Sequence, residues 1–247
     1  MDLAIEGREY AEILEEVNNY HWRKFGMHKG YAGFLYETVW GANPAADVDY
    51  LTAANAATIE STSANDDIGG TGAEKAFIRY LSLAAGPIMT VQEVTKDLDG
   101  TTPVTIASDV YRILKVSVVQ SNNGANDAKN AGTLLVKDSG GTLTLAQVPI
   151  GTNHDQGVFV TVPTGYKGMV KGYTSGPGAA ACGFQFWARE YGKTWQCEGQ
   201  GASWAGNREG TRTPLFRAYP AHTDLELKGN GGGDNWHGIT FVMVRDN

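Results

Sequence analysis

The sequence of 247 residues contains only two cysteines, Cys182 and Cys197. Small secreted domains that are held together by disulfides carry several pairs of cysteines, so this class of protein is excluded. We expect two thiols that are reduced or buried. A disulfide stays an open alternative, because both cysteines lie in neighbouring candidate strands.

Charged residues and long apolar runs are scarce as well. Charged residues make up 19% of the chain and hydrophobic residues 42%, which predicts a globular fold. The formal net charge of -7 argues against nucleic acid as a partner. No stretch approaches the apolar length of a membrane span, so we expect no membrane partner. The first residues, MDLAIEGREY, are acidic where a signal peptide is basic and then apolar, so we expect no signal peptide and synthesis in the cytoplasm of the cell that makes the protein.

The sequence signatures of common catalytic sites are missing too. The five histidines form no His-x-x-x-His pair, and neither a Gly-x-Ser-x-Gly elbow nor a Walker motif is present. We therefore expect no enzyme, no catalytic residue, no cofactor and no metal site. A glycan hydrolase, which needs two facing carboxylates, is the least favoured alternative, because any acidic surface offers such pairs. The carboxylates available for it are Glu190, Glu198, Glu209 and Asp224.

Glycine, by contrast, is abundant at 32 residues and follows no repeat period. From Glu37 onward, strand-like runs alternate with clusters of Gly, Asn, Asp and Ser, which are typical of turns. No helical period follows, so we predict an all-β fold over residues 37–247, in which many short strands indicate a sandwich or a barrel. The apolar residues expected to share strand faces are Leu114, Val116 and Val118; Val158, Val160 and Val162; Leu225 and Leu227; and Ile239, Phe241 and Met243.

The first 36 residues follow a different pattern. Apolar residues recur at helical spacing and predict a short amphipathic helix over residues 7–20. Acidic residues near its start and basic residues after its end suit the helix dipole. We expect residues 1–36 to form this N-terminal helix and an anchoring arm that includes the basic linker WRKFGMHKGY. A helix packed on its own domain stays an open alternative. The residues at helical spacing are Tyr10, Ile13, Leu14, Val17 and Tyr20.

Two loop motifs resemble those of a known family. The segment from Glu37 to Leu83 contains a Ser-rich loop with Asn-Asp and Gly-Thr-Gly-Ala, and Gly-Thr-Thr-Pro-Val follows from Gly100. Together they resemble a family of mostly uncharacterised structural proteins of tailed, largely marine, bacteriophages, over roughly residues 36–175. The chain departs from the family pattern after Ala73, where EKAFIRYLSL replaces a small polar strand.

The resemblance implies a virion protein that acts by assembly, without catalytic residues. Because the double-sheet jelly roll is common in viral coat proteins, we choose a β-sandwich that is jelly-roll-like for residues 37–247. Its place would be head decoration or attachment, or the neck, tail or fibre base. Partners would be other virion proteins and further copies of the chain, with a trimer favoured among closed rings. The alternative is a carbohydrate- or receptor-binding module of the virion that contacts a host-surface glycan.

Five residues are candidates for these contacts. Trp204 and Trp236 lie in glycine-rich loops, where an exposed indole suits a protein or sugar contact. Trp22 belongs to the basic linker. Val242 and Val244 lie on the second apolar face of the last strand-like run, which we expect a neighbouring copy to cover.

Overall fold

The structure, a computed structural model, describes residues 20–28, 37–39, 47–83, 88–122, 129–176, 182–203, 215–231 and 235–246. This part of the chain is all-β, with antiparallel sheets and no helix. It therefore offers no helix of the length and apolarity that a membrane span requires. The helix predicted over residues 7–20 lies outside the described residues, apart from Tyr20, which begins a strand.

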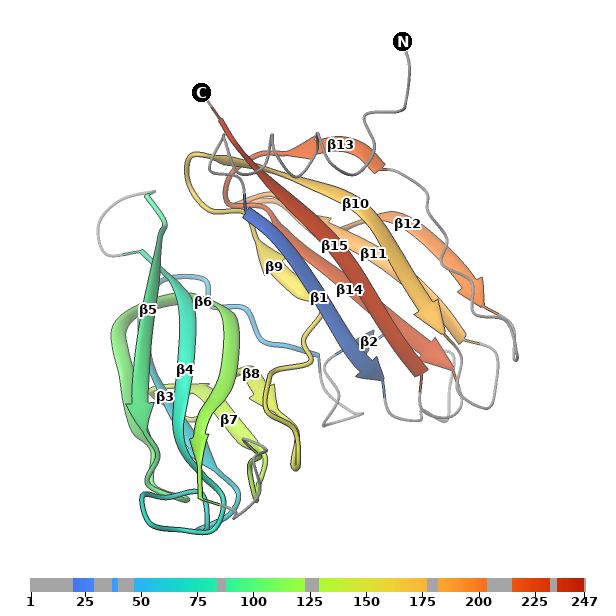
Figure 1. Cartoon of the computed structure of the whole chain (residues 1–247). Helices are drawn as coiled ribbons and strands as arrows, with labels where there is room; N and C mark the ends of the chain where they lie inside the picture. Colours follow the sequence, from blue (N-terminus) through green and yellow to red (C-terminus); the bar gives the residue numbers. More distant parts are fainter. Residues whose placement is uncertain are drawn as a thin grey trace.

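Two sheets face each other across one hydrophobic cluster (Figure 1). Their strands are β1 (Tyr20–His28), β2 (Glu37–Thr38), β9 (Phe159–Thr161), β10 (Tyr166–Gly176), β11 (Cys182–Arg189), β12 (Gln196–Ser203), β13 (Leu215–Tyr219), β14 (Asp224–Gly231) and β15 (Asn235–Arg245). The first sheet has the order β1-β15-β10-β13, and the second has the order β12-β11-β14-β2, with β9 also paired to β14. The pairs β1–β15, β2–β14, β10–β13 and β11–β12 are nested, so that each pair encloses the next along the chain.

A third sheet has six strands in the order β5-β4-β6-β3-β7-β8 and curls into a half-barrel (Figure 1). Its strands are β3 (Asn55–Ser61), β4 (Ala73–Ser82), β5 (Thr90–Asp97), β6 (Val104–Ser121), β7 (Leu134–Asp138) and β8 (Thr144–Val148). This sheet encloses a second hydrophobic cluster of its own. It thus forms a separate packing unit, which we call the six-stranded unit.

The six-stranded unit interrupts a single strand of the five-stranded sheet. The short strands β2 and β9 pair with successive stretches of β14, β2 with Lys228 and Gly229 and β9 with Asp224–Glu226. Between them, the amide of Val158 donates a hydrogen bond to the carbonyl of Val39. The chain therefore leaves the strand after β2, builds the six-stranded unit, and resumes the same strand at β9.

Several strand faces predicted from apolar alternation are confirmed. The cluster between the two facing sheets contains all three valines of the run before Thr164, both leucines of β14, and the three alternating apolar residues of β15. These residues are Val158, Val160, Val162, Leu225, Leu227, Ile239, Phe241 and Met243. Their burial in one cluster accounts for the packing of the two sheets.

The face predicted for β6 is wrong. Leu114 packs in the cluster between the facing sheets, whereas Val116 and Val118 pack inside the six-stranded unit. The reason is a β-bulge: Arg79 of β4 pairs with Lys115, but its neighbour pairs with Ile113, which leaves Leu114 as an extra residue. One extra residue turns every later side chain to the opposite face of the strand.

The segment from Trp22 to His28, expected in a basic linker, lies in strand β1. Strand β1 pairs with β15 along its whole length, from Tyr20 opposite Met243 to His28 opposite Asn235. This pairing satisfies backbone N–H and C=O groups that β15 would otherwise expose at the edge of the sheet. The division of the chain into residues 1–36 and 37–247 stays a prediction.

The motif loop, residues 61–73, is organised around the buried carboxylate of Asp66, which is 0% exposed. Its oxygens accept four hydrogen bonds of 2.5–2.8 Å, from the Ser61 hydroxyl and the amides of Ala73, Ala131 and Gly132. A Cβ on Gly72 would clash with this carboxylate, which explains the glycine. The Asp66 carbonyl also accepts a hydrogen bond from the amide of Gly100. The two motifs that resemble the family are therefore in direct contact.

Candidate functional site

The joint where the six-stranded unit meets the facing sheets contains a buried ion pair. Arg112 of β6 and Asp224 of β14 have side chains that are 8% and 5% exposed. The guanidinium binds the carboxylate through two parallel hydrogen bonds, from Nε at 2.9 Å and from Nη2 at 3.0 Å. Nη1 donates to the carbonyls of Leu51 and Tyr111. The pair therefore ties β6, β14 and the segment that leads into β3 together.

Asp224 is surrounded by donors. Arg189 of β11 contributes a second guanidinium at 2.7 Å, and the Thr161 hydroxyl donates at 2.6 Å. Burial alone would raise the pKa of Asp224, but Arg112, Thr161 and Arg189 outweigh it and hold that pKa below its ordinary value. The same carboxylate raises the pKa of Arg112 against the effect of burial. Both groups are therefore charged and compensated.

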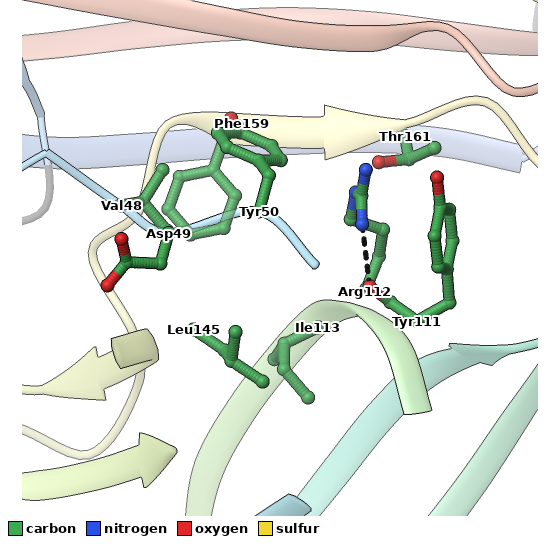
Figure 2. A pocket seen from close by; sticks show the side chains of 9 residues that line it. All are labelled: Val48, Asp49, Tyr50, Tyr111, Arg112, Ile113, Leu145, Phe159 and Thr161. Atoms are coloured by element: carbon green, nitrogen blue, oxygen red, sulfur yellow. Dashed lines mark hydrogen bonds between the residues drawn. The ribbon is translucent and has the colours of Figure 1, made fainter. Parts of the chain in front are cut away.

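The joint leaves almost no empty space. Figure 2 shows Arg112 and Tyr111 extending from β6 toward Thr161, with Tyr50 and Phe159 beside them. The cavity among these side chains is about 10 Å³, room for no more than about one water molecule. The arrangement suits a fixed joint and leaves no room for a ligand.

A second carboxyl group of the joint, Glu226, is best described as protonated near neutral pH. Thr38 Oγ1 lies 2.5 Å from Glu226 Oε1 and 3.1 Å from Asp47 Oδ1, and it accepts a hydrogen bond from the Val48 amide. A hydroxyl has one hydrogen and cannot donate to both carboxylates. If Glu226 carries a proton, it donates to Thr38, and Thr38 donates to Asp47. Tyr50 donates to the other oxygen of Glu226 at 3.1 Å.

We expect the protein to lose stability as the pH rises through 7. Burial raises the pKa of Glu226 from 4.5 to about 7, although Lys228 and Thr38 act in the opposite direction. A raised pKa in the folded state means that the stabilising contribution is complete below pH 4.5 and is lost as the pH passes 7. The expected loss is about 3 kcal/mol, since one pKa unit corresponds to about 1.4 kcal/mol. Urea unfolding measured across this pH range gives the free energy directly.

Glu226→Gln is the control for this pH dependence. Glutamine keeps the shape and can donate to Thr38, but it does not titrate. The difference in unfolding free energy between the variant and the wild type should therefore change with pH, even though Asp47, Asp224 and His222 also titrate in both proteins. A difference that stays constant from pH 5 to pH 8 would contradict the protonated Glu226.

A larger opening lies between the edges of the two facing sheets. The edge cleft, as we call it, has a volume of about 400 Å³ and is lined by residues of β12, β13 and the turn that joins β11 to β12. Arg217 of β13 spans it, binding Glu198 of β12 at 2.5 Å and Glu190 of the turn at 3.1 Å. Below Arg217 lies the Tyr219 ring, 5.2 Å from the guanidinium carbon.

The structure places four of the five predicted contact residues in the β1–β15 ribbon. Trp22 pairs in register with Phe241, and Trp236 lies half-buried near the start of β15. Val242 is 2% exposed, so its side chain is already covered within the chain, while Val244 is half-buried. Trp204 lies outside the described residues. Both cysteines are thiols, Cys182 buried and Cys197 exposed, as expected.

The sequence pattern predicts neither the joint nor the role of Arg217, although Asp224 is among the carboxylates named for a hydrolase. Asp224 and Glu226 alternate with Leu225 and Leu227, a pattern that normally places the polar residues in solvent. A usable signal was Arg112, a charged residue in the middle of an apolar run that is too long to be covered on one face only. Such a residue is rarely buried without a partner of opposite charge.

Among the described residues, no group of three or more His, Cys, Asp or Glu side chains is placed to hold a metal ion. No protein-family model, no curated protein and no solved structure matches this chain.

Proposed function

We propose that the protein is a structural component of a tailed bacteriophage virion and acts by assembly. The observation that carries this proposal is the order of the strands in the two facing sheets. Four nested antiparallel pairs that roll up into two packed sheets are the pattern of a jelly roll, a fold common in viral coat proteins. We therefore propose a jelly-roll sandwich whose second strand, β2 with β9, is interrupted by the six-stranded unit.

The character of the motif loop supports this proposal. The residues that resemble the bacteriophage family, Ser61, Asp66, Gly72 and Gly100, bind each other and neighbouring backbone groups. Their hydrogen bonds therefore stabilise the conformation of the loop. The buried joint likewise fixes the six-stranded unit rigidly on the sandwich, as a building block of a particle requires. The function needs no catalytic step, cofactor or metal.

The proposed partners are further copies of the chain, in a trimer, and other virion proteins. Val244, half-buried near the end of β15, is a suitable position to test the contact between copies. Val242 is less suitable, because a charge at this buried position would disturb folding within one chain.

Quantitative mass spectrometry of purified virions tests the proposal. We expect the protein in the particle, in a copy number divisible by three. Light scattering of the purified protein should give the mass of a trimer, and Val244→Asp should shift it toward the monomer because a buried charge in an apolar contact is unfavourable. Absence of the protein from washed particles would contradict the virion role. A wild-type protein that is monomeric at micromolar concentration would contradict the trimer alone.

A further inference from the structure

We infer that the edge cleft between β12 and β13 is a binding site for a neutral saccharide, formed by Glu190, Glu198, Arg217 and Tyr219. This inference goes beyond assembly and does not depend on the virion role. The cleft volume of about 400 Å³ lies within the range of sites for small molecules.

The charges that line the cleft cancel. Glu190 and Glu198 are balanced by Arg217 and Lys193, so the cleft favours neither an anion nor a cation. Carboxylates only accept hydrogen bonds, and guanidinium and ammonium groups only donate them. A ligand whose polar atoms each donate and accept hydrogen bonds fits beside such groups. The hydroxyl groups of a sugar have this property.

A buried hydroxyl group at the floor of the cleft supplies a second, independent observation. Tyr219 is 0% exposed, and its hydroxyl has no hydrogen-bond partner within the described part of the chain. Burial and the nearby charge of Glu198 raise the pKa of Tyr219 to about 12, so the phenol keeps its proton. A buried donor without a partner costs free energy, and a ligand hydroxyl that accepts this hydrogen bond would relieve that cost.

Arg217 lies on the solvent side of the cleft. Its side chain is 46% exposed, and its guanidinium lies over the Tyr219 ring. Both glutamates are ion-paired to this arginine, whereas glycoside hydrolysis needs one protonated carboxyl group, so we infer binding without cleavage.

Screening the full-length protein on an array of defined neutral and acidic glycans tests the inference. The array identifies a neutral glycan, whose affinity is then measured by isothermal titration calorimetry. Tyr219→Phe removes one hydrogen bond and should weaken this binding about tenfold. Glu198→Gln, which removes the charge that holds Arg217, should also weaken it. Glu198→Gln should melt near the wild-type temperature, because Glu198 belongs to a partly exposed ion pair. Tyr219→Phe should melt at or above that temperature, because phenylalanine removes a buried hydroxyl that has no partner within the described part of the chain.

Tyr80→Phe is the matched control, since it removes a phenolic hydroxyl from a nearly buried tyrosine of β4 in the six-stranded unit. Its affinity for the glycan should equal that of the wild type. Failure of the wild-type protein to bind any neutral glycan would overturn the inference, and so would a preference for acidic glycans. Binding that Tyr219→Phe and Glu198→Gln leave unchanged would place the glycan elsewhere on the protein and overturn the assigned cleft.

Discussion

Replacing Arg112 with methionine should reduce the free energy of unfolding by about 3 kcal/mol. Methionine keeps a long apolar side chain in the joint, but it removes both hydrogen bonds to Asp224. The carboxylate is then left 5% exposed, with Arg189 and Thr161 as its remaining partners. Because a buried charge that loses its partner is strongly destabilising, the loss should far exceed that of a surface pair. Urea unfolding followed by tryptophan fluorescence measures it.

Two further variants make this test specific. Arg112→Lys keeps the positive charge but has no planar fork for two parallel hydrogen bonds, so an intermediate loss is expected. Arg79→Met breaks the ion pair with Glu93, which spans 2.6 Å between side chains that are 33% and 49% exposed. Its cost should be below about 1 kcal/mol. If Arg112→Met were no more harmful than Arg79→Met, the joint would not depend on the buried pair.

The sequence predicts the strands better than it predicts what covers them. Alternation in the runs ending at Val162 and Met243 correctly indicates the core face, because one side of each run packs in a single cluster. The bulge at Leu114 cannot be read from the same alternation, since it depends on how β6 pairs with β4. Local pattern therefore predicts strand faces only between irregularities of the sheet.

The joint was hidden from sequence analysis for a related reason. Asp224 and Glu226 occupy the polar side of an amphipathic strand, and Arg112 and Tyr50, from the part of the chain inserted between β2 and β9, contact them there. Arg112, the partner of Asp224, is 112 residues away from it in the chain. Asp224 carries no local signal of this contact, and Arg112 indicates only that a buried partner of opposite charge exists, not which residue it is. Long-range burial of a polar face is a consequence of topology, which propensity and periodicity do not contain.

The motif loop is the second place where a single substitution should have a large effect. Asp66→Ala removes an acceptor of four hydrogen bonds and leaves the amides of Ala73, Ala131 and Gly132 without it. Each buried donor left unsatisfied costs about 1–3 kcal/mol, so we expect a total loss of about 4 kcal/mol, reduced where water enters the gap. Thermal and urea unfolding of the variant measure this loss.

Asp67→Ala is the control for this substitution, because the buried amides donate to the carboxylate of Asp66 and not to that of Asp67. Its stability should stay within about 0.5 kcal/mol of the wild type. Gly72→Ala should reproduce much of the effect of Asp66→Ala, since the added methyl group would displace the same carboxylate. If Asp66→Ala proved as stable as Asp67→Ala, the motif loop would not hold the fold together. Its residues would then have to act in contacts with a partner, and the resemblance to the bacteriophage proteins would point to a shared binding surface instead of a shared scaffold.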